Sequence, residues 1–281
     1  MSRRARIRWS LGFLIVIHCA VLFCGWLAPY PYAEQHREFP YAAPNRTFLL
    51  GTDGFGRDIF SRLLYGGRVS LFAGLLAAAL SLSLGLFLGV AAGFFGGWVD
   101  ALLMRSGELV MALPWLYLLL AVRALLPLHI GTVAAFLLLI AIIGGLGWVR
   151  PARLVRGIAL SGRERGFVVA ARGFGAGPLY LIRRHILPLT ASVLATQATI
   201  LIPTYVLAEV TLSFLGLGVA EPVPSWGNML ADARQYHALV SYPWLLAPGL
   251  ALIPVLLAFL VLADALLDTQ PGRWSITVNN R

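Results

Sequence analysis

The chain has 281 residues, of which 59% are hydrophobic and 12% are charged, and this balance excludes an ordinary soluble protein. Its formal net charge is +10, and because the sequence contains no Lys, all 22 basic residues are Arg. A phosphate-binding P-loop requires a Lys, so any ATP hydrolysis coupled to this protein must take place on another polypeptide. The composition indicates an integral membrane protein without a P-loop of its own.

Three classes of site are not expected from the sequence. The Arg residues lie in short segments beside apolar runs, without interleaved exposed aromatics, which favours a topology signal over nucleic-acid binding. Cys19 and Cys24 share the first apolar run, where a helix would point them to different faces, so no disulfide is expected. The histidines show no metal-ligand spacing, and we predict no metal site. They are His18, His36, His129, His185 and His237.

The N-terminus has the layout of a first spanning helix rather than of a signal peptide. Residues 1–10 carry four Arg, and the apolar run 11–27 is long for the core of a signal peptide. Segment 26–32 is rich in aromatic residues, as is typical of a chain that crosses the membrane surface. Pro29 and Pro31 are expected to end the helix. We therefore expect residues 11–27 to span the membrane with the N-terminus inside.

Five further apolar segments predict five more spanning helices. The polar, turn-rich segment 30–67 is expected outside, although its four Arg residues go against a strict positive-inside count. Six spans return the C-terminus to the cytoplasm and place residues 150–188 inside and residues 213–241 outside. Glycines in the second span predict close helix packing, and Arg105 and Glu108 in the third are expected to pair. The predicted spans are residues 69–99, 101–124, 131–149, 189–212 and 242–262.

The most basic part of the chain is residues 150–188, with eight Arg and one Glu. Ser161 and Glu164 have the spacing of a capping box, which predicts a short helix that starts at Ser161. The glycines at 173–177 are expected to end this helix, and Pro178 can open a second one. A pair of adjacent alanines gives the first helix a face suited to docking in a groove on another protein.

Polar side chains on the fifth span are candidates for a transport pathway. Glu209 is ionisable and lies near the outer end of the span, where it either serves the pathway or reaches water at a helix end. Gln197 and Thr204 could line the same pathway or hydrogen-bond to neighbouring helices, and Pro203 is expected to kink the helix. Two acids at the inner end of the sixth span are expected to attract the basic segment; these are Asp264 and Asp268.

Part of the basic segment resembles a motif of transport proteins. Ala170 and Ala171, followed by Gly175 and, after ten further residues, by Ile186-Leu187-Pro188, resemble the EAA loop. This loop belongs to the permease subunits of binding-protein-dependent ABC importers.

Several other motifs resemble one branch of these importers, the dipeptide/oligopeptide/nickel branch of the DppC/OppC type. They occur in the same order, without a large gap, over residues 48–268. The matching segments are LGTDGFGRDIFSRLLY at 50–65, RVSL at 68–71, GGWVD at 96–100, RHILP at 184–188, LSFLGLG at 212–218 and PSWGNML at 224–230.

The resemblance implies an all-α integral membrane protein with six transmembrane helices and the type I (MetI-like) importer fold. Residues 1–68 would form an N-terminal transmembrane helix and external loop, residues 69–268 the permease domain with coupling loop 150–188, and residues 269–281 a cytoplasmic tail. The chain would be a non-catalytic subunit of the cytoplasmic (inner) membrane without a cofactor. The resemblance also implies four partner subunits in addition to the lipid bilayer. They are a second homologous permease, two ATP-binding subunits and an external substrate-binding protein.

In the resembling family, the loop helix is a coupling helix that sits in a cleft of the ATPase. The acidic position of the motif is Val169 here, and Gly166 corresponds to a second acid. This chain would therefore use apolar contact through Val169, or the remaining Glu164, in place of a carboxylate. The predicted coupling residues are Glu164, Val169, Ala170, Ala171, Gly175, His185, Leu187 and Pro188.

The cargo and two other classes of protein remain open at this point. The resembling branch carries dipeptides, longer peptides and nickel chelates, and the sequence does not choose among them. A secondary transporter would carry charges near mid-membrane and inverted repeats, and only Glu209 and the Arg105/Glu108 pair suggest such charges. A membrane enzyme would need a nucleophile, base or metal cluster near one membrane face, and the sequence shows no such constellation.

Overall fold

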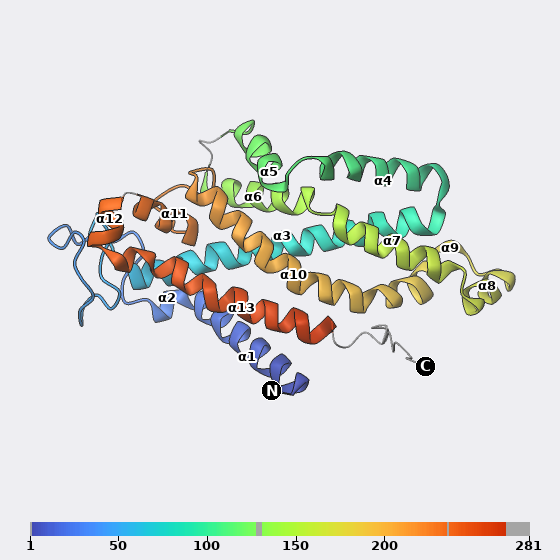
Figure 1. Cartoon of the computed structure of the whole chain (residues 1–281), viewed down its shortest axis with the longest axis horizontal. Helices are drawn as coiled ribbons and strands as arrows, with labels where there is room; N and C mark the ends of the chain where they lie inside the picture. The colour runs from blue at the N-terminus through green and yellow to red at the C-terminus, as the bar shows by residue number, and fades with distance from the viewer. Residues whose placement is uncertain (1, 128–130, 235, 268–281) are drawn as a thin grey trace, which may run out of the picture.

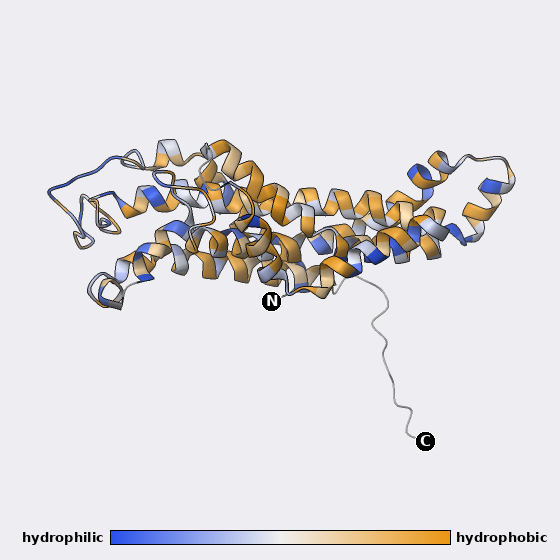
Figure 2. Ribbon diagram, turned by 90° about the horizontal axis from the view of Figure 1, so that it is seen from above, coloured by the Kyte–Doolittle hydropathy of each residue, from blue (hydrophilic) through white to orange (hydrophobic). Residues whose placement is uncertain are grey.

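The computed structural model describes residues 2–127, 131–234 and 236–267, and every regular element within them is a helix. Four helical segments are long and apolar enough to cross a membrane, and two bent helix pairs raise the number to six if each pair is one span. The molecule is elongated, with a largely apolar middle and hydrophilic segments gathered toward its two ends (Figure 2). The predicted tail 269–281, Asp268 and His129 lie outside the described residues.

The first two spans begin earlier than predicted. Helix α1 (Arg3–Leu22) starts within the Arg-rich N-terminus and is followed by the short α2 (Cys24–Leu27). Helix α3 (Ile59–Phe95) starts ten residues before the predicted 69, because Asp58 caps it by accepting a hydrogen bond from the backbone N–H of Ser61 at 2.8 Å. The end of the predicted external loop is therefore the first turns of a 37-residue helix.

The third and fourth spans are broken helices. The prediction of one continuous helix over 101–124 was wrong: α4 (Gly97–Ala112) and α5 (Trp115–Ala124) meet at 91°, since Pro114 cannot continue the hydrogen-bond ladder of α4. Helix α6 (Thr132–Leu146) is followed at 43° by α7 (Val149–Arg163). The first part of the predicted loop 150–188 is thus a helix that extends the fourth span.

The remaining helices complete the bundle. Helix α8 (Gly166–Gly173) and α9 (Pro178–Leu181) lead through a π-helical turn, η1 (Ile182–Ile186), into α10 (Leu187–Phe214), which continues past Pro203. Short helices then lead to the last span, α13 (Ala247–Leu267). They are α11 (Trp226–Ala231), η2 (Asp232–Arg234), α12 (Tyr236–Ser241) and η3 (Pro243–Leu246).

Helix α3 runs through the centre of the bundle, and α7 packs directly on its glycine face (Figure 1). A Cβ atom at Gly89 would lie 2.5 Å from the carbonyl oxygen of Ala152, and one at Gly93 would lie 2.5 Å from that of Arg156. Only glycine allows the two backbones to approach so closely. The predicted close packing of the second span is confirmed, and its partner is α7.

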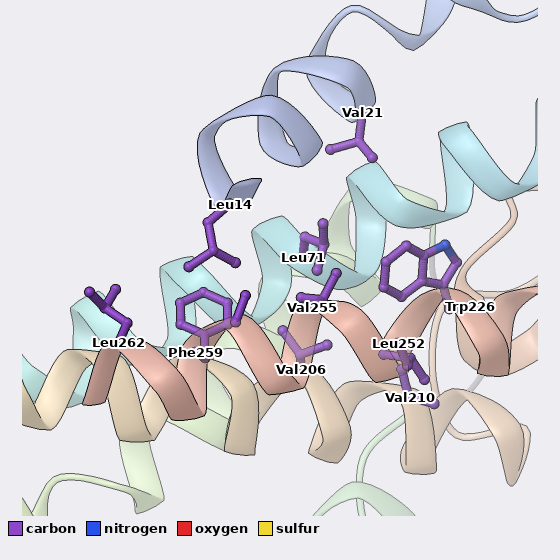
Figure 3. Packing of buried hydrophobic residues seen from close by; sticks show 11 residues of the cluster. Leu14, Val21, Leu71, Val206, Val210, Trp226, Leu252, Val255, Phe259 and Leu262 are labelled. Atoms are coloured by element: carbon purple, nitrogen blue, oxygen red, sulfur yellow. The ribbon is translucent and has the colours of Figure 1, made fainter. Parts of the chain in front are cut away.

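A second contact surface joins α1, α3, α10 and α13 around a hydrophobic cluster (Figure 3). Leu71 and Val206 are fully buried at its centre, and Phe259 of α13 packs against them from the side of α1. The other labelled members are Leu14, Val21, Val210, Trp226, Leu252, Val255 and Leu262. The cluster places α1 and α13 together on one side of α3 and α10.

Two predicted partnerships of charged residues were wrong. Asp264 does not approach the basic segment; it accepts a hydrogen bond from Arg6 of α1 at 2.5 Å, because α1 and α13 pack side by side. Glu108 lies 3.7 Å from Arg153 rather than pairing along its own helix with Arg105, because α7 faces α4. In both cases the acid pairs with an Arg residue on a neighbouring helix and not with the partner that the local sequence pattern predicts.

An ionic network ties the loop before α3 to the loop after α10. Asp53 accepts hydrogen bonds from the backbone N–H groups of Phe55 and Arg57 at 2.9 Å and from Arg57 Nε at 2.6 Å. Arg57 and Arg62 donate to the two carboxylate oxygens of Glu221 at 2.5 and 2.8 Å. Two of the Arg residues that opposed the positive-inside count are therefore paired with acids.

Asp232 lies beside this network, in a small cavity that Asp53 and Arg62 also line. Burial and the nearby Asp53 raise the pKa of the Asp232 carboxyl to about 6. Because this pKa is higher than that of an Asp in the unfolded chain, Asp232 keeps its proton to a higher pH in the folded protein than in the unfolded one. The free energy of unfolding therefore falls as the pH rises from about 4 to about 6, and it is level above that range. Because part of the residue still faces solvent, the effect should be smaller than the full pKa shift implies.

We predict that Asp232→Asn removes this part of the pH dependence. Thermal unfolding in lipid nanodiscs from pH 4 to 8 would measure it, as the difference between the wild type and the variant at each pH. The difference should grow between pH 4 and 6 in favour of Asp232→Asn, because the amide has no ionisation cost. A pH-independent difference would contradict the assignment.

Packing of α7 on α3 gives a second prediction. Gly89→Ala should lower the unfolding free energy by roughly 1–3 kcal/mol, the usual cost of overpacking, because its Cβ meets the backbone of α7. Gly145→Ala in α6 is the matched control, since a Cβ there meets nothing within 4 Å. Denaturation in detergent would compare the two, and equal stabilities would show that α7 is not held by close contact.

Candidate functional site

The coupling segment, residues 164–188, forms one end of the molecule, opposite the loop that precedes α3 (Figure 1). The predicted helix start at Ser161 was wrong. Ser161 lies in the last turn of α7, where its hydroxyl donates to the carbonyl of Ile158 at 3.1 Å, and the next helix starts at Gly166. The amphipathic helix α7 remains packed on α3 up to Arg163, so no new helix can begin at Ser161. Glu164 is the exposed C-cap residue between the two helices.

Helix α8 has an anchored side and a free side. Val168 is fully buried in a cluster with α3, α7 and η1, and the partly buried Ala171 packs against the same cluster. On the other side, Val169 is 52% exposed and Ala170 is exposed as well. Phe174, just after the helix, is 92% exposed. The segment thus presents an apolar surface while one face holds it to the bundle.

The predicted glycine elbow is present. Helix α8 ends at Gly173, and Gly175 adopts φ +86°, a left-handed conformation that residues with a side chain rarely adopt. Ala176 N–H donates to the carbonyl of Ala171 at 3.0 Å and closes the end of the helix. Pro178 then opens α9, as predicted. The elbow turns the chain back toward the membrane helices.

The last three predicted coupling residues lie at the start of α10. His185 is in the π-helical turn, with its ring centroid 5.5 Å from that of Phe167 and 5.9 Å from that of Tyr180. Leu187 packs on the same buried cluster as Val168, and Pro188 occupies the first turn of α10. The structure therefore brings the predicted coupling residues to one end, although their role in coupling stays a prediction.

A cleft of about 880 Å³ opens where the two broken helix pairs face α10. It lies at the α4–α5 break, at the α6–α7 break and along the middle of α10. Gln197 and Thr204, both predicted for the pathway, line it. Its other lining residues are Val110, Met111, Leu113, Pro114, Trp115, Leu146, Gly147, Val149, Arg150, Arg153, Leu154, Ile200, Leu201 and Tyr205.

One wall of the cleft is fixed by aromatic and hydroxyl contacts. The rings of Trp115 and Tyr205 stack with centroids 6.0 Å apart, and the Tyr205 hydroxyl lies 2.9 Å from the hydroxyl of Ser81 on α3. Thr204 donates to the carbonyl of Ile200 within α10 at 2.7 Å. Tyr205 thus braces this wall of the cleft against the central helix α3.

Glu209 does not line this cleft. It is fully buried, and one carboxylate oxygen accepts a hydrogen bond from Ser213 at 2.6 Å. Its other oxygen has no hydrogen-bond partner within the described part of the chain, although Ser70 and Ser225 are close. The structure therefore separates Glu209 from Gln197 and Thr204, with which the sequence had grouped it.

Sequence reasoning missed Arg123. It is 1% exposed and donates hydrogen bonds to the carbonyls of Leu217 at 2.7 Å and Pro127 at 3.2 Å. The guanidinium group thereby joins the end of α5 to the loop after α10. The available signal was a single Arg at the end of an otherwise apolar run, which usually requires a specific partner.

Comparison with known proteins identifies the family. Residues 85–274 match the family described as the inner membrane component of binding-protein-dependent transport systems. The chain belongs to this family. It is 40% identical over 274 residues to a putative peptide permease protein of Brucella suis, covering 97% of this chain and 88% of that protein.

Two further relatives agree over most of the chain. A di/tripeptide transport system permease protein of Pseudomonas aeruginosa is 40% identical over 267 residues, with 92% of this chain and 84% of that protein covered. A glutathione transport system permease protein of Escherichia coli is 37% identical over 258 residues, covering 91% and 82%. The chain is therefore a multi-pass inner membrane permease subunit and not an enzyme. Because this family works in binding-protein-dependent transport systems, the match rules against the secondary-transporter alternative.

The elbow gives a prediction for coupling. Gly175→Leu should abolish ATP-dependent uptake, because a Leu at φ +86° is strained and would change the path from α8 to α9. Gly177→Leu is the matched control, since Gly177 has φ −72° and open space around it. Normal uptake by Gly175→Leu would refute the docking role of the segment.

Val169→Glu should be tolerated in the same uptake assay, because Val169 is half exposed.

Proposed function

We propose that the chain is one of two permease subunits of an ATP-driven importer that carries di- and oligopeptides across the cytoplasmic membrane. Two ATPase subunits and an external substrate-binding protein complete the transporter. The observation that carries the proposal is the course of α7, which begins at the cleft and ends at Arg163, directly before the coupling segment. Movement of an ATPase against the exposed face of α8 would act on α7 and so on the wall of the cleft.

The second permease has a natural place on the open side of the cleft. Apolar side chains of α4, of α5 and of the break between them remain exposed, including Leu109 at 75%, Leu113 at 55% and Tyr117 at 71%. An apolar surface beside an open cleft suits a membrane partner of similar fold that would enclose the pathway. A homologous permease would supply the missing wall.

The ends of the chain support an orientation for the proposed subunit. The start of α1 and the end of α13 lie together, joined by Arg6 and Asp264, and the four Arg residues at the N-terminus favour the cytoplasm. The coupling segment carries four more Arg residues between 164 and 188. Both termini and the coupling segment are therefore assigned to the cytoplasmic side.

Peptides are the cargo that the relatives support. The names of the Brucella and Pseudomonas relatives specify peptides and di/tripeptides, and that of the Escherichia coli relative specifies glutathione, itself a tripeptide. Nickel chelates are the second candidate within the same branch. The cleft of about 880 Å³ has the size of a site for a small organic molecule.

Reconstitution tests this function. The chain would be co-expressed with a second permease, the ATPases and the binding protein and placed in proteoliposomes. We expect the ATPases to co-purify with it and labelled dipeptide to enter only with hydrolysable ATP. Uptake that persists without the ATPases would refute coupling to ATP, and uptake of a nickel chelate without peptide uptake would refute the cargo.

A further inference from the structure

The polar groups of the cleft lining are dominated by cations and hydrogen-bond donors. Arg150 and Arg153 line the cleft where α7 begins, and Gln197 lines it from α10. No Asp or Glu is among the lining residues of the described chain. A cargo group with negative charge is the one that this end of the cleft attracts.

The two Arg residues differ in their partners. Arg153 lies 3.7 Å from Glu108, whose charge offsets its own. Arg150 is exposed and has no ion pair among the described residues. It is also the second residue of α7, where the helix dipole disfavours a positive side chain. Its position is therefore not explained by stabilisation of the helix.

A small peptide offers the negative charge that this end of the cleft attracts. Its terminal carboxylate matches the planar guanidinium group of Arg150, which can donate two parallel hydrogen bonds to it.

We propose that Arg150 binds the C-terminal carboxylate of the peptide as it passes through the cleft. This assignment rests on the peptide-import function proposed above. Arg150 thereby makes the permease itself, and not only the binding protein, select free peptide acids over peptide amides.

The test compares a labelled dipeptide with its C-terminal amide in the reconstituted transporter. Both would be supplied with saturating loaded binding protein, so that differences in capture do not enter the rates. The wild type should import the acid about tenfold faster than the amide, as expected for one charge-assisted hydrogen bond. Arg150→Gln should bring the ratio close to one by slowing only the acid, and Arg150→Lys should keep part of the preference.

Arg105→Gln is the matched control, because Arg105 is an exposed Arg on the neighbouring α4 that does not line the cleft. It should keep the wild-type ratio. An unchanged ratio in Arg150→Gln would overturn the assignment of Arg150 while leaving peptide import intact. A failure of the wild type to import any peptide would instead refute the proposed function.

Discussion

The close contact between α3 and α7 is the constraint on which the rest of this structure depends. It exists because glycines at 89 and 93 leave room for the backbone of α7 against the central helix. The contact is reinforced from both sides. Arg156 of α7 forms a bidentate pair with Asp100 of α4, one bond of which measures 2.6 Å, and Arg163 donates to the carbonyls of Gly93 and Phe94 at the end of α3.

Because α7 is fixed along α3, its two ends acquire different roles. The N-terminal end meets the α6–α7 break and forms part of the cleft, while the C-terminal end delivers α8 beyond the bundle. A Cβ at Gly147 would lie 1.9 Å from the Tyr205 hydroxyl, so this side chain fills the corner where α6 turns into α7. The break is thus supported by α10 and is a defined bend rather than a loose joint.

Sequence patterns predicted the membrane character, the approximate spans and the family, because these depend on long apolar runs and short local motifs. They did not predict α7, because its apolar residues alternate with Arg residues, and such a basic segment is also typical of a loop. The break at Pro114 was hidden inside an apolar run, where hydropathy alone does not distinguish one span from two half-helices.

The candidate site was predictable in part for the same reason. Ala171, Gly175 and Pro188 could be located from a motif, and the structure places them at one end. Cleft residues such as Trp115 and Arg150 come from three separate segments, so only the tertiary fold brings them together. The partners of Glu108 and Asp264 likewise lie on other helices, at separations that no local spacing rule covers.

The π-helical turn at Ile182–Ile186 sets the rotational register of α10. An α-helix advances by about 100° per residue, so a turn that holds one extra residue rotates all side chains that follow it. Insertion or loss of a residue within the turn would rotate α10 as a whole, carrying Gln197 and Thr204 away from the cleft. Chain length should therefore scarcely vary among related permeases within this turn.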